Sequence, residues 1–389
     1  MAFVDYANGS GQRKVAEQLD NGVETAAEIS RVLGISDSNA RKQVRLLRAR
    51  AGVKDRTQHL GQTAEGFAIK KTSTNYDKDG NINQQWVIAH QDVERQAELL
   101  REYISGLSES VPPAKPVKRT SKNLNPNIMP SIFIGDAHIG MQAYASETRH
   151  SDFNVDIACS QLREGADYLI DRAEPAETGL LVDVGDFLHP NGRMATTLKG
   201  TPLDTDQTYY RMMKAAGSVM RYFIDKMLTK FGRVLVVQTP GNHNTDPAIG
   251  LQIALEFLYA NEPRVTILKN ESFYNYIEFG KWLLGFSHGD KQKPESLVAN
   301  MARDMASAWG RTTHRMWCTG HYHKEMVRTF PGCKHKVFGA LPPPDSWHAS
   351  EGYMGDGEME MITFRKEGGL HSSHTYNIPQ PRVEPDVRI

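Results

Sequence analysis

The sequence predicts an α/β (α+β) protein with two domains, and three observations lead to this prediction. Its 389 residues exceed what one small core commonly holds. Residues 105–130 are rich in Pro, Ser, Asn and Lys and poor in large apolar side chains, which is typical of a linker. Beyond them, apolar β-rich runs alternate with helical patterns, as in α/β domains. We therefore expect a domain at 1–104, a flexible linker at 105–130 and a domain at 131–389.

Composition sets limits on the class of protein. The 46 basic and 46 acidic residues give zero net charge, so an argument for nucleic acid must come from local patterns. The cysteines Cys159, Cys318 and Cys333 lack CxxC spacing, which indicates reduced thiols rather than a disulfide framework or a thiolate zinc site. No signal-peptide pattern opens the chain, and no apolar run approaches the ~20 residues of a membrane span. We expect a cytoplasmic protein that does not contact membranes.

In the first domain, residues 24–52 read as helix, tight turn, helix. Thr25 can cap the first helix with Glu28 as its capping-box partner, Gly34 ends that helix, and Ser36 offers a second cap. The second helix carries apolar positions for packing and a group of basic residues, among them Arg41, Lys42, Arg45 and Arg48. This pattern resembles the helix-turn-helix family, whose second helix enters the major groove of DNA.

The segment that follows extends the resemblance. Residues 67–90 look like a β-hairpin that turns at Asp79-Gly80, and a helix is expected at about 92–104. Helices and hairpin together resemble a winged helix-turn-helix that binds nucleic acid. The alternative is a small helical domain with one solvated basic face.

One sequence pattern recurs in the second domain: an apolar run is followed by a short loop that contains Asp, His or Asn. Helical patterns intervene at about 155–172, 206–230 and 247–260, and loops at strand ends are where α/β folds place ligands. These loops contain far more histidines than a random distribution along the chain would place there. The five loops carry, in order, Asp136 and His138; Asp186 and His189; Asn242 and His243; His288; and His321 and His323.

The residue types in these loops point to metal chemistry. Imidazoles, carboxylates and an amide oxygen, without a thiolate, suit divalent Mn, Fe, Zn, Co or Ni. Two carboxylates and several neutral ligands around two dications would leave a net positive site. Such a site would attract a phosphate and acidify a bound water.

The motif order D-x-H, G-D-x-x-H, G-N-H, H-G and G-H-x-H resembles the calcineurin-like metallophosphoesterase superfamily over about residues 128–375. The resemblance implies a sandwich of two mixed sheets flanked by helices, with two divalent ions at the strand ends. Mn²⁺ is the leading expectation, with Fe, Zn, Co or Ni as other fitting ions. The first ion would take Asp136, His138, Asp186 and His323, and Asp186 would bridge to the second ion, which takes Asn242, His288 and His321. His243 would be the catalytic histidine, which gives a proton to the leaving oxygen.

The stretch GDFLHPNGR, residues 185–193, bears on the substrate. It looks like the nucleases of double-strand-break repair, in which the histidine matching His189 helps to position the scissile phosphate. The alternative is a His189 that only hydrogen-bonds a neighbouring loop. Those nucleases often dimerise, so a homodimer is one expectation of the resemblance. They also carry an ATPase-docking segment, which is not expected at this C-terminus because residues 359–378 look like closing strands.

The leading hypothesis is a metal-dependent phosphodiesterase, a DNA endonuclease or exonuclease whose first domain holds DNA. This layout resembles phage- and prophage-encoded proteins. A second hypothesis is a phosphomonoesterase, protein phosphatase or cyclic-nucleotide phosphodiesterase whose first domain binds DNA or a partner. A third is a DNA-binding regulator with a vestigial phosphoesterase domain, which the complete ligand set disfavours.

Two further polar residues near the motifs leave their roles open. Asp183 lies in the strand before Asp186, where it could hydrogen-bond a ligand residue or face solvent. Asn244 stands where the resembling family usually has Asp or Glu, and its amide is expected to orient His243 without raising the imidazole pKa as a carboxylate would. If the two side chains interact, Asn244→Asp should shift the pH–rate profile upward.

Overall fold

The computed structural model describes residues 2–23, 25–60, 67–76, 82–91, 117–269, 272–346, 349, 355 and 357–379. The chain divides into two compact units, Met1–Leu99 and Leu100–Ile389. The expected turn at Asp79-Gly80, the expected helix at 92–104 and residues 105–116 of the expected linker lie outside the described residues.

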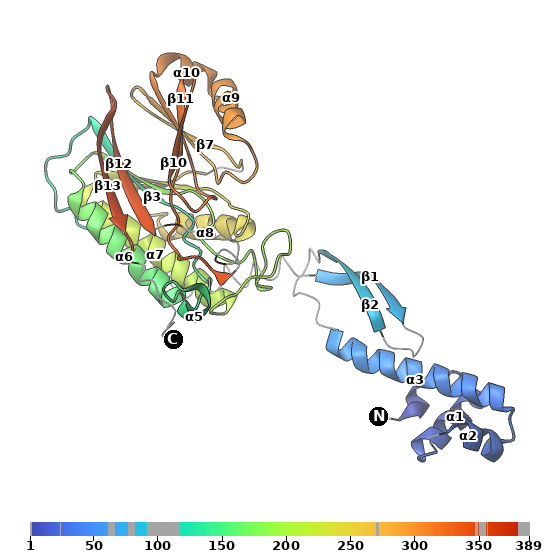
Figure 1. Cartoon of the computed structure of the whole chain (residues 1–389). Coiled ribbons are helices and arrows are strands. Elements are labelled where there is room, and N and C mark those ends of the chain that lie inside the picture. The colour runs from blue at the N-terminus through green and yellow to red at the C-terminus, as the bar shows by residue number, and fades with distance from the viewer. Residues whose placement is uncertain are drawn as a thin grey trace, which may run out of the picture. The chain divides into compact units, whose positions relative to one another are not determined.

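The N-terminal unit contains short helices followed by one long helix and two strands (Figure 1). Its elements are η1 (Phe3–Tyr6), α1 (Ser10–Asp20), α2 (Ala26–Leu33), α3 (Asp37–Leu60), β1 (Phe67–Tyr76) and β2 (Ile82–Gln91). β1 and β2 pair antiparallel, as expected for a hairpin. A small core forms where α1, α2 and α3 bring together Val15, Ile29, Val44 and Leu47, all of them buried.

The predicted caps of the N-terminal helices are present. The Thr25 hydroxyl oxygen accepts a hydrogen bond from the Glu28 backbone N–H at 3.3 Å, and the same hydroxyl donates to the Glu28 carboxylate at 2.7 Å. Gly34 follows α2 in the left-handed conformation, with φ of 64°, which a glycine adopts without steric cost. Ser36 Oγ accepts from the Asn39 N–H at 3.3 Å at the start of α3. Local sequence therefore sets where α2 begins and ends and where α3 begins.

The C-terminal unit contains a six-stranded sheet in the order β13-β12-β3-β4-β5-β6. β3, β4, β5 and β6 run parallel, and β12 joins β3 antiparallel, so the sheet is mixed. The strands are β3 (Ile128–Ile134), β4 (Thr178–Asp183), β5 (Arg233–Gln238), β6 (Val265–Ile267), β12 (Glu358–Arg365) and β13 (Leu370–Asn377).

A second, five-stranded sheet has the order β10-β11-β9-β8-β7. It is also mixed, because β8, β9 and β11 are parallel whereas β7 and β10 are antiparallel to their neighbours. The strands are β7 (Asn275–Phe279), β8 (Trp282–Phe286), β9 (His314–Thr319), β10 (Met326–Phe330) and β11 (Cys333–Val337). Two mixed sheets with helices are the arrangement that the sequence led us to expect.

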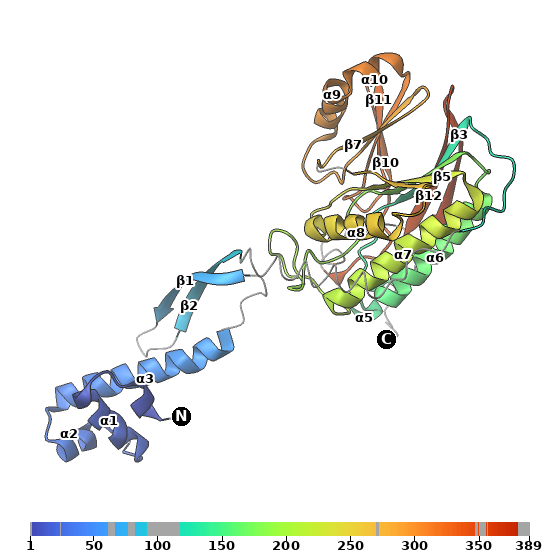
Figure 2. The ribbon, with the colours of Figure 1, turned by 180° about the vertical axis from the view of Figure 1, so that it is seen from behind.

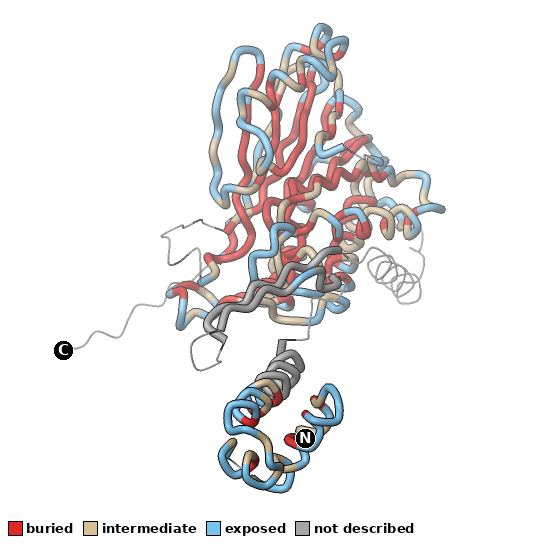
Figure 3. The backbone as a smooth tube through the Cα atoms, turned by 90° about the vertical axis from the view of Figure 1, so that its right-hand side faces the viewer, coloured by how far each residue is buried: buried red, intermediate tan, exposed pale blue. Residues whose placement is uncertain are grey.

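Helices cover the outer faces of this sheet pair, as Figures 1 and 2 show. α6 (Val155–Arg172), α7 (Tyr209–Lys230) and α8 (Thr245–Leu258) pack on the six-stranded sheet, and α9 (Pro294–Asp304) and α10 (Ala306–Arg311) accompany the other sheet. A short helix, α5 (Ala145–Thr148), precedes α6. Between the sheets lies an apolar layer that includes Phe133, Val182 and Phe286. Buried residues run along the strands in Figure 3. Each described helix is too short or too polar to span a membrane.

The predicted linker ends too late in the sequence. Residues 128–130 belong to the buried strand β3. The segment before β3 is also fixed to the C-terminal unit, since the Thr120 N–H donates to the Thr229 carbonyl at 2.8 Å and Arg264 donates to the Val117 carbonyl at 2.8 Å. Polar composition alone suggested a free segment, but its backbone groups find hydrogen-bond partners on helices and loops far along the chain.

Candidate metal centre

All five motif loops lie at the carboxyl ends of strands. They follow β3, β4 and β5 in the six-stranded sheet and β8 and β9 in the five-stranded sheet. Within each sheet these strands are parallel neighbours, so their carboxyl ends lie at one edge. The topology therefore gathers side chains that lie more than a hundred residues apart in the sequence.

Two groups of potential ligands result, and each contains one carboxylate and two imidazoles. Within each group the ligand atoms lie within 4.8 Å of one another. The first group is Asp136, His138 and His323, and the second is Asp186, His288 and His321. Asp186 lies in the second group, whereas the resemblance assigned it to both ions, so the division of the ligands between two ions and the bridging role of Asp186 stay predictions.

Individual distances show how tightly the ligand atoms converge. His288 Nε2 lies 2.9 Å from Asp186 Oδ2 and 3.0 Å from Asn242 Oδ1, so the Asn242 amide oxygen joins the second group. His138 Nε2 and His323 Nε2 lie 3.1 Å apart in the first group. Two imidazole nitrogens at that distance compete for one proton, whereas both can donate a lone pair to one cation.

The backbone is unusual at the same residues. Of the seven non-glycine residues with positive φ in the described part of the chain, five are candidate ligands: Asp136, His138, Asp186, His321 and His323. Left-handed backbone is uncommon for residues with a Cβ, and such strain is found where function requires a fixed side-chain direction. The loops are thus shaped to aim these side chains at common points.

Two glycines in the motifs are required by close approach to the carboxylates. A Cβ on Gly241 would lie 2.0 Å from Asp186 Oδ1, and a Cβ on Gly320 would lie 2.5 Å from Asp136 Oδ2. Both distances are far below van der Waals contact. The glycines of the G-N-H and G-H-x-H motifs therefore let two loop backbones pass directly against the buried carboxylates.

Burial and charge fit divalent cations. Asp136, Asp186 and His288 are almost completely buried. Burial raises the pKa of Asp136 to about 8 against the opposing charge of His288. Burial would lower the pKa of His288, but the charge of Asp186 and the hydrogen bond with it raise that pKa to about 10. In the metal-free protein, bound protons compensate the negative charge of the buried carboxylates. Cations bound by these oxygens and imidazoles would replace those protons.

In a third group, the predicted catalytic histidines His189 and His243 lie close to the candidate metal ligand His138. His138, His189 and His243 also have nitrogens within 4.8 Å of one another. His243 Nδ1 lies 2.9 Å from the His189 carbonyl oxygen, and the His243 backbone N–H donates to Asp186 Oδ1 at 2.8 Å. His189 Nδ1 lies 3.1 Å from His138 Nδ1. His243 is therefore fixed by contacts to both neighbouring loops, and the His189 ring contacts a candidate ligand.

Asn244 differs from the expectation that it orients the His243 ring. Its fully buried amide oxygen accepts hydrogen bonds from the backbone N–H groups of Asp186 at 3.2 Å and Gly241 at 3.0 Å. The described contact of His243 Nδ1 is instead the His189 carbonyl. Asn244 thus joins the loops after β4 and β5. Sequence reasoning missed this role because the partners are backbone groups of another loop.

Asp183 also has a definite position. Its side chain is completely buried, so the alternative of a solvent-facing strand position is wrong. Its Oδ1 accepts from the Gly185 N–H at 2.9 Å, and desolvation raises its pKa to about 7. Asp183 therefore holds the turn that leads to Asp186.

The predicted nucleic-acid residues lie in the N-terminal unit, far along the chain from the metal ligands. Arg41, Lys42, Arg45 and Arg48 are all exposed on α3, while Ala40, Val44 and Leu47 on the same helix are buried. One face of α3 packs and the other presents positive charge. Arg41 also pairs with Asp37 at 2.7 Å.

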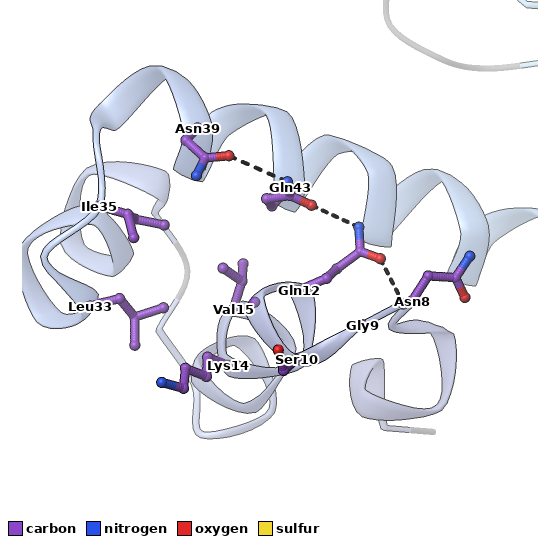
Figure 4. A pocket seen from close by; sticks show the side chains of 11 residues that line it. Asn8, Gly9, Ser10, Gln12, Lys14, Val15, Leu33, Ile35, Asn39 and Gln43 are labelled. Carbon is purple, nitrogen blue, oxygen red and sulfur yellow. Dashed lines mark hydrogen bonds between the residues drawn. The ribbon is translucent and has the colours of Figure 1, made fainter.

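A pocket of about 580 Å³ in the N-terminal unit was not predicted from the sequence (Figure 4). It lies between α1 and α3, where Gln12 donates to Gln43 at 2.9 Å and Gln43 donates to Asn39 at 3.3 Å. Amide side chains line it together with Val15, Leu33 and Ile35. Residues on three helices form this pocket, so no local sequence pattern could predict it.

Comparisons with known proteins gave structural likenesses only. No protein-family model and no curated protein sequence matches the chain. Among solved structures, the chain is similar to an archaeal phosphodiesterase, with 12% identity and a TM-score of 0.33, covering 64% of this chain and 100% of that one. It is also similar to YfcE, a phosphoesterase from E. coli, with 13% identity and a TM-score of 0.31, covering 66% and 100%. Zinc-complexed Vps29 from Entamoeba histolytica gives 12% identity and a TM-score of 0.25, covering 64% and 99%.

Proposed function

We propose that the C-terminal unit is a metal-dependent phosphoesterase of the calcineurin-like kind that hydrolyses phosphodiester bonds in DNA. One observation carries the proposal: five loops at one edge of two sheets bring two carboxylate–imidazole groups together beside His243. Buried groups of this composition are costly to maintain unless a cation compensates them. The arrangement fits divalent metal ions better than it fits a structural polar network.

The ligands divide between two ions. Asp136, His138 and His323 would hold one, and Asp186, Asn242, His288 and His321 would hold the other, with Asp186 shared between them. Bound divalent ions would supply Lewis-acid activation of water and neutralise charge on the phosphate. The donor set suits Mn²⁺, and it also suits Fe, Zn, Co or Ni.

The proposed role of His243 follows from its hydrogen bonds. A hydrogen bond with the His189 carbonyl requires a proton on Nδ1, since a carbonyl oxygen only accepts. Nε2 is then the nitrogen that can exchange a proton with the leaving oxygen. The bond from the His243 N–H to Asp186 keeps the ring at a fixed place relative to the ligands. His243 would act as general acid when Nε2 is protonated.

DNA is the proposed substrate for two reasons. The sequence of the loop that carries His189 resembles that of repair nucleases, and His189 lies beside both His138 and His243. The N-terminal unit has three helices and an antiparallel strand pair, with Arg41, Lys42, Arg45 and Arg48 exposed on its long helix. This supports a winged helix-turn-helix that holds DNA through its phosphates.

A substrate panel tests the proposal. Metal-depleted protein is restored with Mn²⁺, Zn²⁺, Fe²⁺, Co²⁺ or Ni²⁺ in turn and is offered labelled single-stranded DNA, labelled duplex DNA and an aryl phosphomonoester. We expect metal-dependent cleavage of DNA, and Asp186→Asn serves as the inactive control. Hydrolysis of the monoester with both DNA substrates untouched would overturn the nuclease proposal and favour a phosphatase.

A further inference from the structure

The candidate centre is buried on most sides and reaches solvent at one edge. Asp136, His138, Asp186 and His288 are buried, whereas four other residues of the centre are partly exposed. We call these four the open edge: Asn242, His243, His321 and His323. A phosphodiester has to enter there, so side chains that border the open edge contact the groups on either side of the phosphate.

Tyr322 borders the open edge on the loop after β9. It lies between the candidate ligands His321 and His323, and 47% of its surface is exposed. Its ring meets the His321 ring edge to face, with centroids 5.2 Å apart. Its backbone N–H donates to the Gly320 carbonyl at 3.0 Å, which closes a tight turn. The aromatic ring is therefore held close to the centre with much of its surface free for contact.

Leu198 borders the same edge from a different loop. Its backbone N–H donates to the carbonyl oxygen of Asn242 at 3.2 Å, and 46% of its surface is exposed. Leu198 sits in a closed turn, because the Thr197 N–H donates to the Thr201 carbonyl at 3.0 Å and the Gly200 N–H donates to the Thr197 carbonyl at 2.9 Å. The backbone of this turn therefore lies against the backbone of a candidate metal ligand, and the Leu198 side chain is partly exposed.

The loop that carries Leu198 is fixed at both of its ends. Asn191 and Asp246 exchange two hydrogen bonds, at 3.2 and 3.3 Å, and Asp246 lies in the first turn of α8, just after His243. Near the other end, the Gln142 N–H donates to the Asp204 carbonyl at 3.1 Å. A loop anchored in this way can hold Leu198 in place without needing a substrate to order it.

Both residues adjoin members of one ligand group. His288 contacts Asn242 at 3.0 Å, and the His288 and His321 rings lie 5.0 Å apart. Leu198 meets this group through the Asn242 backbone, and Tyr322 meets it through the His321 ring. An exposed aromatic ring beside a phosphate site matches a nucleotide, whose planar base stacks on such rings while its phosphate enters the charged centre.

We propose that Tyr322 stacks on the base next to the scissile phosphate and that Leu198 packs against the same nucleotide, so the substrate class is a nucleotide phosphodiester. This inference rests on the proposed phosphodiesterase function. Base stacking on an aromatic side chain changes affinity by about 5- to 150-fold. Loss of the Tyr322 ring should therefore remove a preference for base-bearing substrates of that size.

Two diesters with the same leaving group test the proposal. One is thymidine 5′-(p-nitrophenyl phosphate), and the other is methyl p-nitrophenyl phosphate, which lacks a base. We expect the wild-type protein to favour the thymidine ester in kcat/KM. Tyr322→Ala should lose that preference, measured as the ratio of the two kcat/KM values within one protein, Tyr322→Phe should retain it, and Leu198→Ala should lose part of it. An unchanged preference in Tyr322→Ala would overturn the stacking role.

A matched control and a binding measurement separate the outcomes. Phe257→Ala removes an aromatic side chain that is 72% exposed in the last turn of α8, about 18 Å along the helix from Thr245, and should change neither rate. His243→Ala protein loaded with Mn²⁺, in which turnover is slow, should quench the fluorescence of a trinucleotide that contains 2-aminopurine, and the same protein with Tyr322→Ala should not. If the protein hydrolyses neither diester, the phosphodiesterase proposal fails, whereas quenching that persists in Tyr322→Ala defeats the stacking role alone.

Discussion

His243 Nδ1 lies 2.9 Å from the backbone carbonyl oxygen of His189, and the two imidazole rings stack with centroids 5.3 Å apart. The contact joins the loop after β4 to the loop after β5 through a main-chain atom. A main-chain acceptor survives any substitution of the His189 side chain. The contributions of the two histidines can therefore be separated by mutation.

His243→Ala should reduce turnover by about 10²- to 10⁴-fold, the usual contribution of a general acid. Metal content should stay at the wild-type level, because Asp136, Asp186 and His288 keep their positions. Elemental analysis of the purified variant and single-turnover kinetics measure the two quantities. Wild-type turnover in this variant would show that His243 has no catalytic role.

His189→Ala should weaken metal binding by about 10- to 100-fold, as loss of a group that orients a ligand does. The reason is that His189 Nδ1 lies 3.1 Å from Nδ1 of the candidate ligand His138. Competition with a fluorescent chelator measures the affinity. A raised KM with unchanged metal affinity would instead favour the phosphate-positioning role that the sequence motif suggested.

Asn244→Ala should lower the free energy of unfolding by about 1–3 kcal/mol for each buried N–H left without an acceptor. Those donors are the backbone N–H groups of Asp186 and Gly241. Asn244→Asp keeps an acceptor for both, so it is the matched control. Its pH–rate profile should not move, because the His243 ring is held by the His189 carbonyl. Urea unfolding and a pH–rate series give the two readouts.

Metal binding should release protons and strengthen as pH rises. With pKa values of about 8 for Asp136 and about 10 for His288, both groups hold protons at pH 7 in the metal-free protein. Ligands bind metals in the deprotonated form, so binding should release about one to two protons at pH 7. Calorimetry in two buffers with different ionisation enthalpies measures that number. Asp136→Asn should reduce it, and heats that do not depend on the buffer would contradict the prediction.

Arg45→Ala combined with Arg48→Ala should weaken DNA binding and reduce its salt dependence. Each phosphate contact contributes about 0.9 to the slope of log affinity against log salt on duplex DNA. Arg303→Ala, on α9 of the C-terminal unit, is a control that removes one positive charge outside α3, and its slope should equal that of the wild type. Fluorescence anisotropy over a salt series provides the slopes. Equal slopes for all three proteins would exclude α3 as the DNA-contacting helix.

The sequence by itself determined the positions of the polar loops and of several helices and strands, whereas α1, α9 and α10 were not predicted. The helical pattern at 155–172 matches α6, and the pattern at 247–260 lies within two residues of α8 at both ends. Apolar runs mark strands because a strand buried on both faces must be apolar along its length. The polar residues that follow these runs can therefore be recognised from the sequence alone, and they include each candidate ligand named above.

Only the tertiary structure decided what each polar group contacts. Asn244 lies 58 residues from Asp186 in the sequence, yet its amide oxygen binds the Asp186 backbone. The burial of Asp183 and the attachment of residues 117–127 to the C-terminal unit were likewise decided by groups far along the chain. The physical reason is that periodicity reports only which faces are apolar. A hydrogen bond between two loops depends on where the packed strands bring their ends together, to within a few tenths of an ångström.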